Sequence, residues 1–413
     1  MKTTPVKGCV DYLPQEASLR NAVIGKILQV YKQNGFLLIK TPVLENLENL
    51  TSGDSGDNAK LMFKTLKRGA KLNLEKPNLT EADLAEEGLR YDLTVPLARF
   101  FSAYRNDLPF PFKSIQIDES FRAERPQEGR NRQFTQCDID IWGERTSLGE
   151  IEIILTAMDA YSSVNIPDVI CKISSRKILN EIILEAGFQQ NDVNDVCIII
   201  DKLEKIGLEG CRGELEAKGY NEENITKLLD DLSSILKNGI DSCQKFENIQ
   251  DEVQNVKNVI ETVSKFAPND YKIKFDISVV RGQGYYTGMV FEIFCESSGF
   301  RGAIGGGGRY DNMYSKFAGE QIPAVGYGLG LDSVLLALKK LGEENQFSEP
   351  KLALICYENS TASEIIQKKN QLKAKFNVST FPFPKNFKEF LRRIKLNGFS
   401  YIMKIDKNDA EEI

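Results

Sequence analysis

One hairpin constrains the fold of this chain more than any other segment. Over residues 115–122 and 136–141, apolar and polar side chains alternate, which is the period of a strand with one face on a core. The polar face carries Gln116, Asp118, Ser120 and Arg122 on the first strand, and Gln136, Asp138 and Asp140 on the second. The sequence therefore predicts two strands that present their polar side chains together.

The arginines of this hairpin point to an anionic ligand. Five arginines lie between positions 122 and 145, beside carboxylates that the same strands hold in place. Guanidinium groups bind phosphates and carboxylates through two hydrogen bonds at once, so the pattern favours phosphate recognition. A solvent-facing amphipathic hairpin is the alternative interpretation.

The chain contains no histidine, which limits the chemistry it can perform. Nucleophiles activated by histidine and metals bound by imidazole are excluded. Any reaction must therefore use arginine, carboxylates, backbone groups and bound ions.

The charge is unevenly distributed along the chain. The 413 residues can hold two or three domains and carry a net charge of −6. Residues 351–404, however, contain 11 Lys or Arg against Glu358, Glu364 and Glu389. This C-terminal segment is either a nucleic-acid contact or a lysine-rich solvated surface.

Cysteine and hydropathy patterns indicate the compartment. The eight cysteines form no CxxC pair, which is typical of reduced thiols that fill a core. No apolar run reaches the length of a membrane span, and the first residues lack the apolar region of a signal peptide. We expect a cytoplasmic protein with no membrane segment.

Periodicity predicts the order of elements. Helices are expected at 16–34, 148–164 and from 331, with short strands at 36–40, 273–281 and 285–294. Residues 89–95 alternate like a strand, residues 51–60 have the composition of a loop, and residues 175–265 are helical and charged, like an inserted domain. After Pro350, strands and helices alternate as in a small α/β module.

Six segments in order resemble the class II aminoacyl-tRNA synthetases and, within them, the histidyl-tRNA synthetases. The helix, strand and proline at 19–45 resemble the first class II motif, FRAERPQEGRNRQFTQCDIDIWG at 121–143 the second, and GLGLDSVLLAL at 328–338 the third. Similar to the histidyl branch are LRYDLTVPLARF at 89–100, RGQGYYTG at 281–288 and GGGGRYD at 305–311.

The resemblance implies an α+β fold, in which an antiparallel sheet of six or seven strands is flanked by helices. It implies four parts: the first part of a catalytic core at 1–170, a helical insertion at 171–268, the second part of the core at 269–345, and a C-terminal α/β anticodon-binding-like domain at 346–413. It also implies a homodimer that joins L-histidine to the 3′-terminal adenosine of tRNA(His), using ATP and Mg²⁺.

The resemblance assigns roles to residues of the six segments. Catalysis at the α-phosphate falls to Arg122 and Arg281. Histidine binding falls to Asp92, Leu93, Thr94, Gln136, Asp140, Tyr285 and Tyr286. ATP binding falls to Arg122, Glu124, Arg130, Arg281 and Arg309, with Arg132 near the outer phosphates or the tRNA end. No protein ligand is assigned to Mg²⁺.

Three departures from the family keep other functions open. Ser333 stands where the third motif normally has an arginine that clamps ATP, and Arg301 or Arg309 are candidates to replace it. Gln283 and Gly284 replace a Leu-Asp pair, and the C-terminal module is short. The alternatives are a histidine-sensing regulatory subunit of the type that controls ATP phosphoribosyltransferase, and a degenerate synthetase that binds histidine or tRNA without joining them.

Overall fold

A computed structural model describes residues 1–51, 61–281, 285–347 and 350–413. Almost all of the loop predicted at 51–60, and the exchange at Gln283 and Gly284, lie outside these residues. The chain divides into two compact units, residues 1–9 with 26–341, and residues 10–25 with 342–413. The four-part division expected from the sequence stays a prediction.

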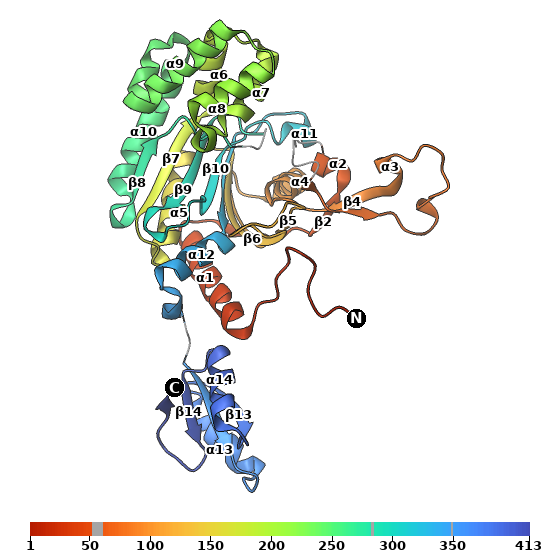
Figure 1. Ribbon diagram of the computed structural model, residues 1–413, viewed down its shortest axis with the longest axis vertical. Coiled ribbons are helices and arrows are strands. Elements are labelled where there is room, and N and C mark those ends of the chain that lie inside the picture. Colours follow the sequence, from red (N-terminus) through yellow and green to blue (C-terminus); the bar gives the residue numbers. More distant parts are fainter. Residues whose placement is uncertain (52–60, 282–284, 348–349) are drawn as a thin grey trace. The chain divides into compact units, whose positions relative to one another are not determined.

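A large mixed sheet forms the centre of the first unit (Figure 1). Its described strands, in spatial order, are β1 (Leu37–Leu38), β5 (Phe112–Phe121), β6 (Gln133–Trp142), β11 (Ala324–Gly330), β10 (Gly305–Arg309), β9 (Met289–Cys295), β7 (Val169–Ser175) and β8 (Lys272–Phe275). The pairs β1–β5 and β7–β8 are parallel and the other neighbours are antiparallel. The predicted antiparallel sheet is confirmed, with an added parallel strand at each edge.

The hairpin predicted from alternation is β5–β6. Its register sets Gln116 opposite Asp138 and Ser114 opposite Asp140, so these polar side chains share one face. Cys137, Ile139 and Ile141 take the other face and are buried. The polar face is buried as well, because Gln116, Asp138 and Asp140 are at most 4% exposed. The solvent-facing alternative is therefore wrong.

The helices follow the sequence pattern closely. Helices α1 (Pro14–Gln33), α5 (Leu148–Ser163) and α12 (Leu331–Leu341) confirm the three predicted helices. The predicted helical segment contains α6 (Arg176–Glu185), α7 (Val193–Ile200), α8 (Leu203–Ala217), α9 (Glu222–Asn238) and α10 (Gln250–Phe266), which gather at one end of the sheet in Figure 1. Residues 171–175 lie in strand β7, so the helical segment begins at Arg176.

The strand pattern at 89–95 is a wrong prediction. Strand β4 (Ala85–Leu89) ends there and α4 (Thr94–Tyr104) begins. Asp92 Oδ1 accepts a hydrogen bond from the backbone N–H of Val95 at 3.1 Å, which satisfies a donor of the first helical turn. Pro96 is tolerated in that first turn because its missing N–H has no partner within the helix anyway.

Smaller elements complete the first unit. Strand β4 pairs with β2 (Leu44–Asn46) and β3 (Lys64–Leu66), beside the short helices α2 (Leu47–Thr51) and α3 (Glu81–Leu84). Another short helix, α11 (Ser315–Ala318), precedes β11.

The C-terminal module is a four-stranded sheet with two helices. The alternation after Pro350 predicts three of these strands and both helices, and β15 is an additional strand. The strands β12 (Lys351–Cys356), β13 (Asn377–Pro382) and β14 (Tyr401–Lys404) are parallel, and β15 (Glu411–Glu412) pairs antiparallel to β14. The helices are α13 (Ala362–Leu372) and α14 (Phe387–Leu396). Among the described residues, no helix has the length and apolarity to cross a membrane.

Candidate active site

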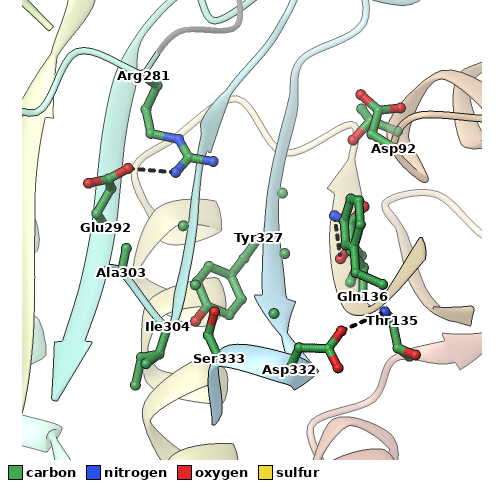
Figure 2. A pocket seen from close by; sticks show the side chains of 18 of the residues that line it. Asp92, Thr135, Gln136, Arg281, Glu292, Ala303, Ile304, Tyr327, Asp332 and Ser333 are labelled. Carbon is green, nitrogen blue, oxygen red and sulfur yellow. Dashed lines mark hydrogen bonds and ion pairs between the residues drawn. The ribbon is translucent and has the colours of Figure 1, made fainter. Parts of the chain in front are cut away.

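One pocket on the large sheet brings most of the predicted residues together. Its walls come from the β5–β6 hairpin, the segment before α4, the segment that precedes β9, and the start of α12; strands β10 and β11 supply its floor. Figure 2 shows Arg281 and Glu292 on one side of this pocket, and Asp92 and Gln136 on the opposite side. Of the residues assigned from the sequence, those that line it are Asp92, Thr94, Arg122, Glu124, Arg130, Gln136, Asp140, Arg281, Tyr285 and Tyr286.

The floor is built from glycines because larger side chains do not fit there. A Cβ at Gly306 would overlap the guanidinium of Arg281, and one at Gly326 would overlap the carboxylate of Asp140. A Cβ at Gly328 would lie 2.9 Å from Asp138 Oδ1. The glycine clusters thus leave room for polar side chains of neighbouring strands and for a ligand.

Two buried oxygen acceptors in the wall have no partner among the described residues. They are Asp92 Oδ2 and Gln136 Oε1, whose side chains line the same pocket. The other Asp92 oxygen caps α4, and Gln136 Nε2 donates to Asp138 at 3.3 Å. A buried acceptor without a donor is unfavourable, so both oxygens favour a ligand that carries N–H groups.

Arg122 is fixed at the rim of the hairpin. Its Nε donates to the carbonyl of Tyr91 at 3.0 Å, and its guanidinium carbon lies 5.0 Å from the ring centre of Phe134. No described carboxylate forms an ion pair with it. The charge of Arg122 opposes the burial-driven rise in the pKa of Asp92 and Asp138, and its outer N–H donors point to a ligand in the pocket as their partner.

Arg281 faces the same pocket from the other side of the floor. Its Nη1 donates to Glu292 Oε1 at 2.7 Å, and its backbone has a φ of 64°. Few residues other than glycine adopt that conformation, so the surrounding structure holds Arg281 in place.

Three buried carboxylates lie in this pocket, where the sequence had assigned roles to only two. Burial raises the pKa of Asp92 and of Asp138, and it raises the pKa of Asp140 to about 7. The hydroxyl of Tyr310 donates to Asp140 and opposes this shift. Asp138 alternates with Gln136 and Asp140 along β6, a signal that could have found it; Tyr310 lies in the quoted GGGGRYD segment.

The two tyrosines of RGQGYYTG pack on the core and also line the pocket. Tyr286 is 8% exposed, and Tyr285 lies edge-on to Tyr310 with ring centres 5.9 Å apart. A hydrogen bond joins Tyr285 to Thr94. Both phenols line the pocket, and the carboxylate that acts electrostatically on each of them is Asp92.

Several assigned residues lie outside the pocket. Leu93 is fully buried, and its carbonyl accepts from Gln116 Nε2 at 2.9 Å. Arg309 is 7% exposed, and two hydrogen bonds of 2.6 Å join its guanidinium to Glu150. Arg132 donates to the carbonyl of Glu124, and Arg301 is exposed and away from the lining. Because its guanidinium is hydrogen-bonded to Glu150 and lies outside the pocket lining, Arg309 does not support the assignment to ATP binding.

The third-motif residues lie at the end of the pocket near α12. Figure 2 shows Asp332 and Ser333 at the same end of the pocket, and Asp332 Oδ2 accepts from the backbone N–H of Thr135 at 3.3 Å. Ser333 lines the pocket, but a hydroxyl group cannot replace the charge of an arginine there.

We expect Gly326→Ala to impair the pocket at Asp140. Gly326 pairs with Asp140 across β6 and β11, so the new methyl group must displace the carboxylate that Tyr310 holds. For the histidine substrate and the pyrophosphate exchange that the sequence resemblance implies, the KM should rise at least about tenfold, since one displaced charge-assisted hydrogen bond costs about 1.5–3 kcal/mol. Gly213→Ala is the matched control, because nothing lies within 4 Å of its added Cβ. An unchanged KM for the Gly326 variant would refute this placement of Asp140.

Comparisons with known proteins agree with this geometry. The family model described as histidyl-tRNA synthetase matches residues 8–334. A histidine–tRNA ligase of Leifsonia xyli is 37% identical over 80% of this chain and 79% of its own length. The crystal structure of histidyl-tRNA synthetase from Nostoc sp. PCC 7120 superimposes with a TM-score of 0.75 at 27% identity, over 97% of this chain and 91% of that one.

A Bacillus halodurans structure titled ATP phosphoribosyltransferase regulatory subunit/histidyl-tRNA synthetase gives a TM-score of 0.78 at 18% identity, covering 98% of both chains. At that identity the likeness shows the shared fold alone. The family match and the 37% identical relative decide the assignment. This chain belongs to the histidyl-tRNA synthetase family.

Proposed function

We propose that this chain activates L-histidine with ATP to histidyl-adenylate and transfers the histidyl group to the 3′-terminal adenosine of tRNA(His). The observation that carries the proposal is one pocket lined by three arginines, two buried acceptors without a partner among the described residues, and a floor of glycines. An amino acid presents an ammonium group and a carboxylate, and a nucleotide presents phosphates. The pocket offers a complementary group for each of these.

The first step needs no side-chain base. A carboxylate oxygen of histidine attacks the α-phosphorus of ATP, the bond to the α,β-bridging oxygen breaks, and pyrophosphate leaves with the electron pair. The carboxylate is already ionised at neutral pH, so catalysis consists of alignment and of neutralising charge on the α-phosphate. Arg122 and Arg281 supply that charge from opposite sides, which suits a chain without histidine.

Recognition of histidine is shared between two sets of residues. Asp92 Oδ2, Gln136 Oε1 and Thr94 bind the α-ammonium group, which fills the empty acceptors. Asp140, Tyr285 and Tyr286 bind the imidazole ring. An amino acid without ring nitrogens would leave these buried groups unpaired, which gives strong discrimination.

ATP occupies the rest of the pocket. Arg130 and Glu124 line it from the β5–β6 loop. Phe134 also lines it, with its ring centre 5.0 Å from the guanidinium carbon of Arg122. Mg²⁺ usually keeps several waters and binds through phosphates and one or two carboxylates. Glu124 is the carboxylate of this loop that would meet the ion, which neutralises phosphate charge when bound.

Three further features bear on the partners and the cellular location of the protein. Leu37 and Leu38 are 48% and 52% exposed on the edge strand β1, which supports the homodimer implied by the first class II motif. The basic segment 351–404 supports an anticodon contact by the C-terminal module. A cytoplasmic location fits eight free thiols.

The second candidate is a regulatory protein that binds histidine without activating it, and Ser333 is the observation that favours it. One assay separates the two, namely charging of tRNA with labelled histidine, with and without ATP. ATP-dependent charging is the expected result. Histidine binding without adenylate or charging would select the regulatory protein and refute the ligase.

We expect Ser333→Arg to lower the KM for ATP by about fivefold or more. The side chain at 333 lines the pocket, and a guanidinium there can stack on the base and bind a phosphate. Initial-rate pyrophosphate exchange at varied ATP measures it, with the KM for histidine as the internal control. An unchanged KM for ATP would mean that another group already performs this role.

A further inference from the structure

Glu292 lies in the wall of the pocket beside the catalytic arginine, and nothing in the sequence pattern assigned it a role. It is on β9, and the β9–β10 register sets it opposite Gly306. The guanidinium of Arg281 lies over that same glycine, where any larger side chain would overlap it. Gly306 therefore leaves the space in which Arg281 and Glu292 meet.

The contact between the two side chains is direct. Arg281 Nη1 donates to Glu292 Oε1 at 2.7 Å, and the side chains are 21% and 28% exposed. Figure 2 shows the pair on one side of the pocket, with the guanidinium directed toward the floor strands. The contact uses one of the five N–H donors of the guanidinium, and a hydrogen bond also joins the Arg281 side chain to Tyr286. The remaining donors can reach a phosphate.

Stability alone does not account for this pair. A partly exposed ion pair contributes little to folding, since solvent screens it and both side chains lose rotamer freedom. Arg281 also has a left-handed backbone, a conformation that persists only where surrounding contacts hold it. Glu292 supplies such a contact from a rigid central strand.

We infer that Glu292 is a positioning residue for the adenylation step, which holds the guanidinium of Arg281 in the orientation that meets the α-phosphate. The inference rests on the proposed function, because it requires that Arg281 act on that phosphate. It differs from a latch, in which Glu292 would have to release Arg281 before the reaction. A positioning residue raises the rate while it stays in contact, whereas a latch lowers it.

The test measures histidine-dependent pyrophosphate exchange and single-turnover adenylate formation for Glu292→Gln, Glu292→Ala, Arg281→Ala and the double alanine variant. For Glu292→Ala we expect kcat to fall at least tenfold while the KM for histidine changes less than twofold. Glu292→Gln keeps the shape and one acceptor oxygen, so its rate should lie between the wild type and Glu292→Ala. In the Arg281→Ala background, Glu292→Ala should have no further effect.

The matched control is Glu152→Gln. Glu152 pairs with Lys113 at 2.8 Å with similar side-chain exposure, 35% and 28%, and it lies outside the pocket. This variant should keep the wild-type kcat. If Glu292→Ala fails to fold, Glu292→Gln carries the test through its fall in kcat.

Three results would overturn the inference: a wild-type kcat in both Glu292 variants, a faster Glu292→Ala, or equal effects of Glu292→Ala with and without Arg281. Failure of the proposed function looks different. In that case Arg281→Ala itself would retain exchange. Loss of exchange in Arg281→Ala with normal Glu292 variants would sink the positioning role alone.

Discussion

Arg122→Ala should lower kcat/KM for histidine-dependent pyrophosphate exchange by at least about a thousandfold. The guanidinium of Arg122 lines the pocket from the β5–β6 hairpin. We propose that it contacts both the carboxylate of histidine and the α-phosphate of ATP. Its loss also removes the positive charge that lowers the pKa of Asp92, so the ammonium site would be weakened as well. Arg122→Lys keeps the charge without the paired donors, so its kcat/KM should lie between those of the wild type and Arg122→Ala.

Arg145→Ala is the matched control for this experiment. Arg145 belongs to the same arginine-rich segment, but it is exposed and outside the pocket lining. Its rate of pyrophosphate exchange should equal the wild-type rate. Near-normal exchange by Arg122→Ala, in a protein with an unchanged melting temperature, would show that Arg122 does not act on the reacting groups.

Asp140→Asn should stabilise the folded protein at pH 8 and remove histidine recognition. Burial raises the pKa of Asp140 to about 7, against 3.8 ordinarily. The folded state thus binds a proton that the unfolded state has lost, and stability falls as the pH rises from about 4 to about 7. Above that range, the buried charge of the native carboxylate lowers the free energy of unfolding by up to about 4 kcal/mol, and an amide at this position has no such cost.

The pH dependence makes this prediction specific. The difference in melting temperature between Asp140→Asn and the wild type should be positive at pH 8 and much smaller at pH 5, where the folded carboxyl group is protonated. The KM for histidine should rise about a hundredfold or more, because the amide lacks the charge that meets the ring N–H. The control is Asp107→Asn, at an exposed position. Its melting temperature should differ from that of the wild type by the same amount at pH 5 and at pH 8.

An equal shift in melting temperature at both pH values would mean that burial of the Asp140 charge does not destabilise the fold. An unchanged KM for histidine would place the imidazole elsewhere. The two readouts are independent, so each part of the account can fail alone.

The central hairpin could be predicted because alternation along β5 and β6 depends only on local geometry. The same signal failed at 89–95, where the Asp92 side chain caps α4 and the alternation reflects the first turn of a helix. A side chain that bonds to its own backbone overrides a short pattern.

The pocket was predicted in part, for a different reason. Residues in quoted segments, such as Arg122 and Asp140, line it because their strands fix their direction. The position of Glu292 in the pocket depends on the β9–β10 register. The burial of Arg309 depends on its partner Glu150, which lies 159 positions away in sequence. No local pattern carries that information, so the ion pairs of Arg281 and Arg309 required the structure.

The most direct test of the central claim is a crystal structure with a non-hydrolysable histidyl-adenylate analogue whose phosphate is replaced by a sulfamoyl group. The account predicts that Arg122 and Arg281 both donate to oxygens of that one group, and that the imidazole contacts Asp140 beside Tyr285 and Tyr286. An analogue held by only one of the two arginines, or bound away from the glycine floor, would contradict it.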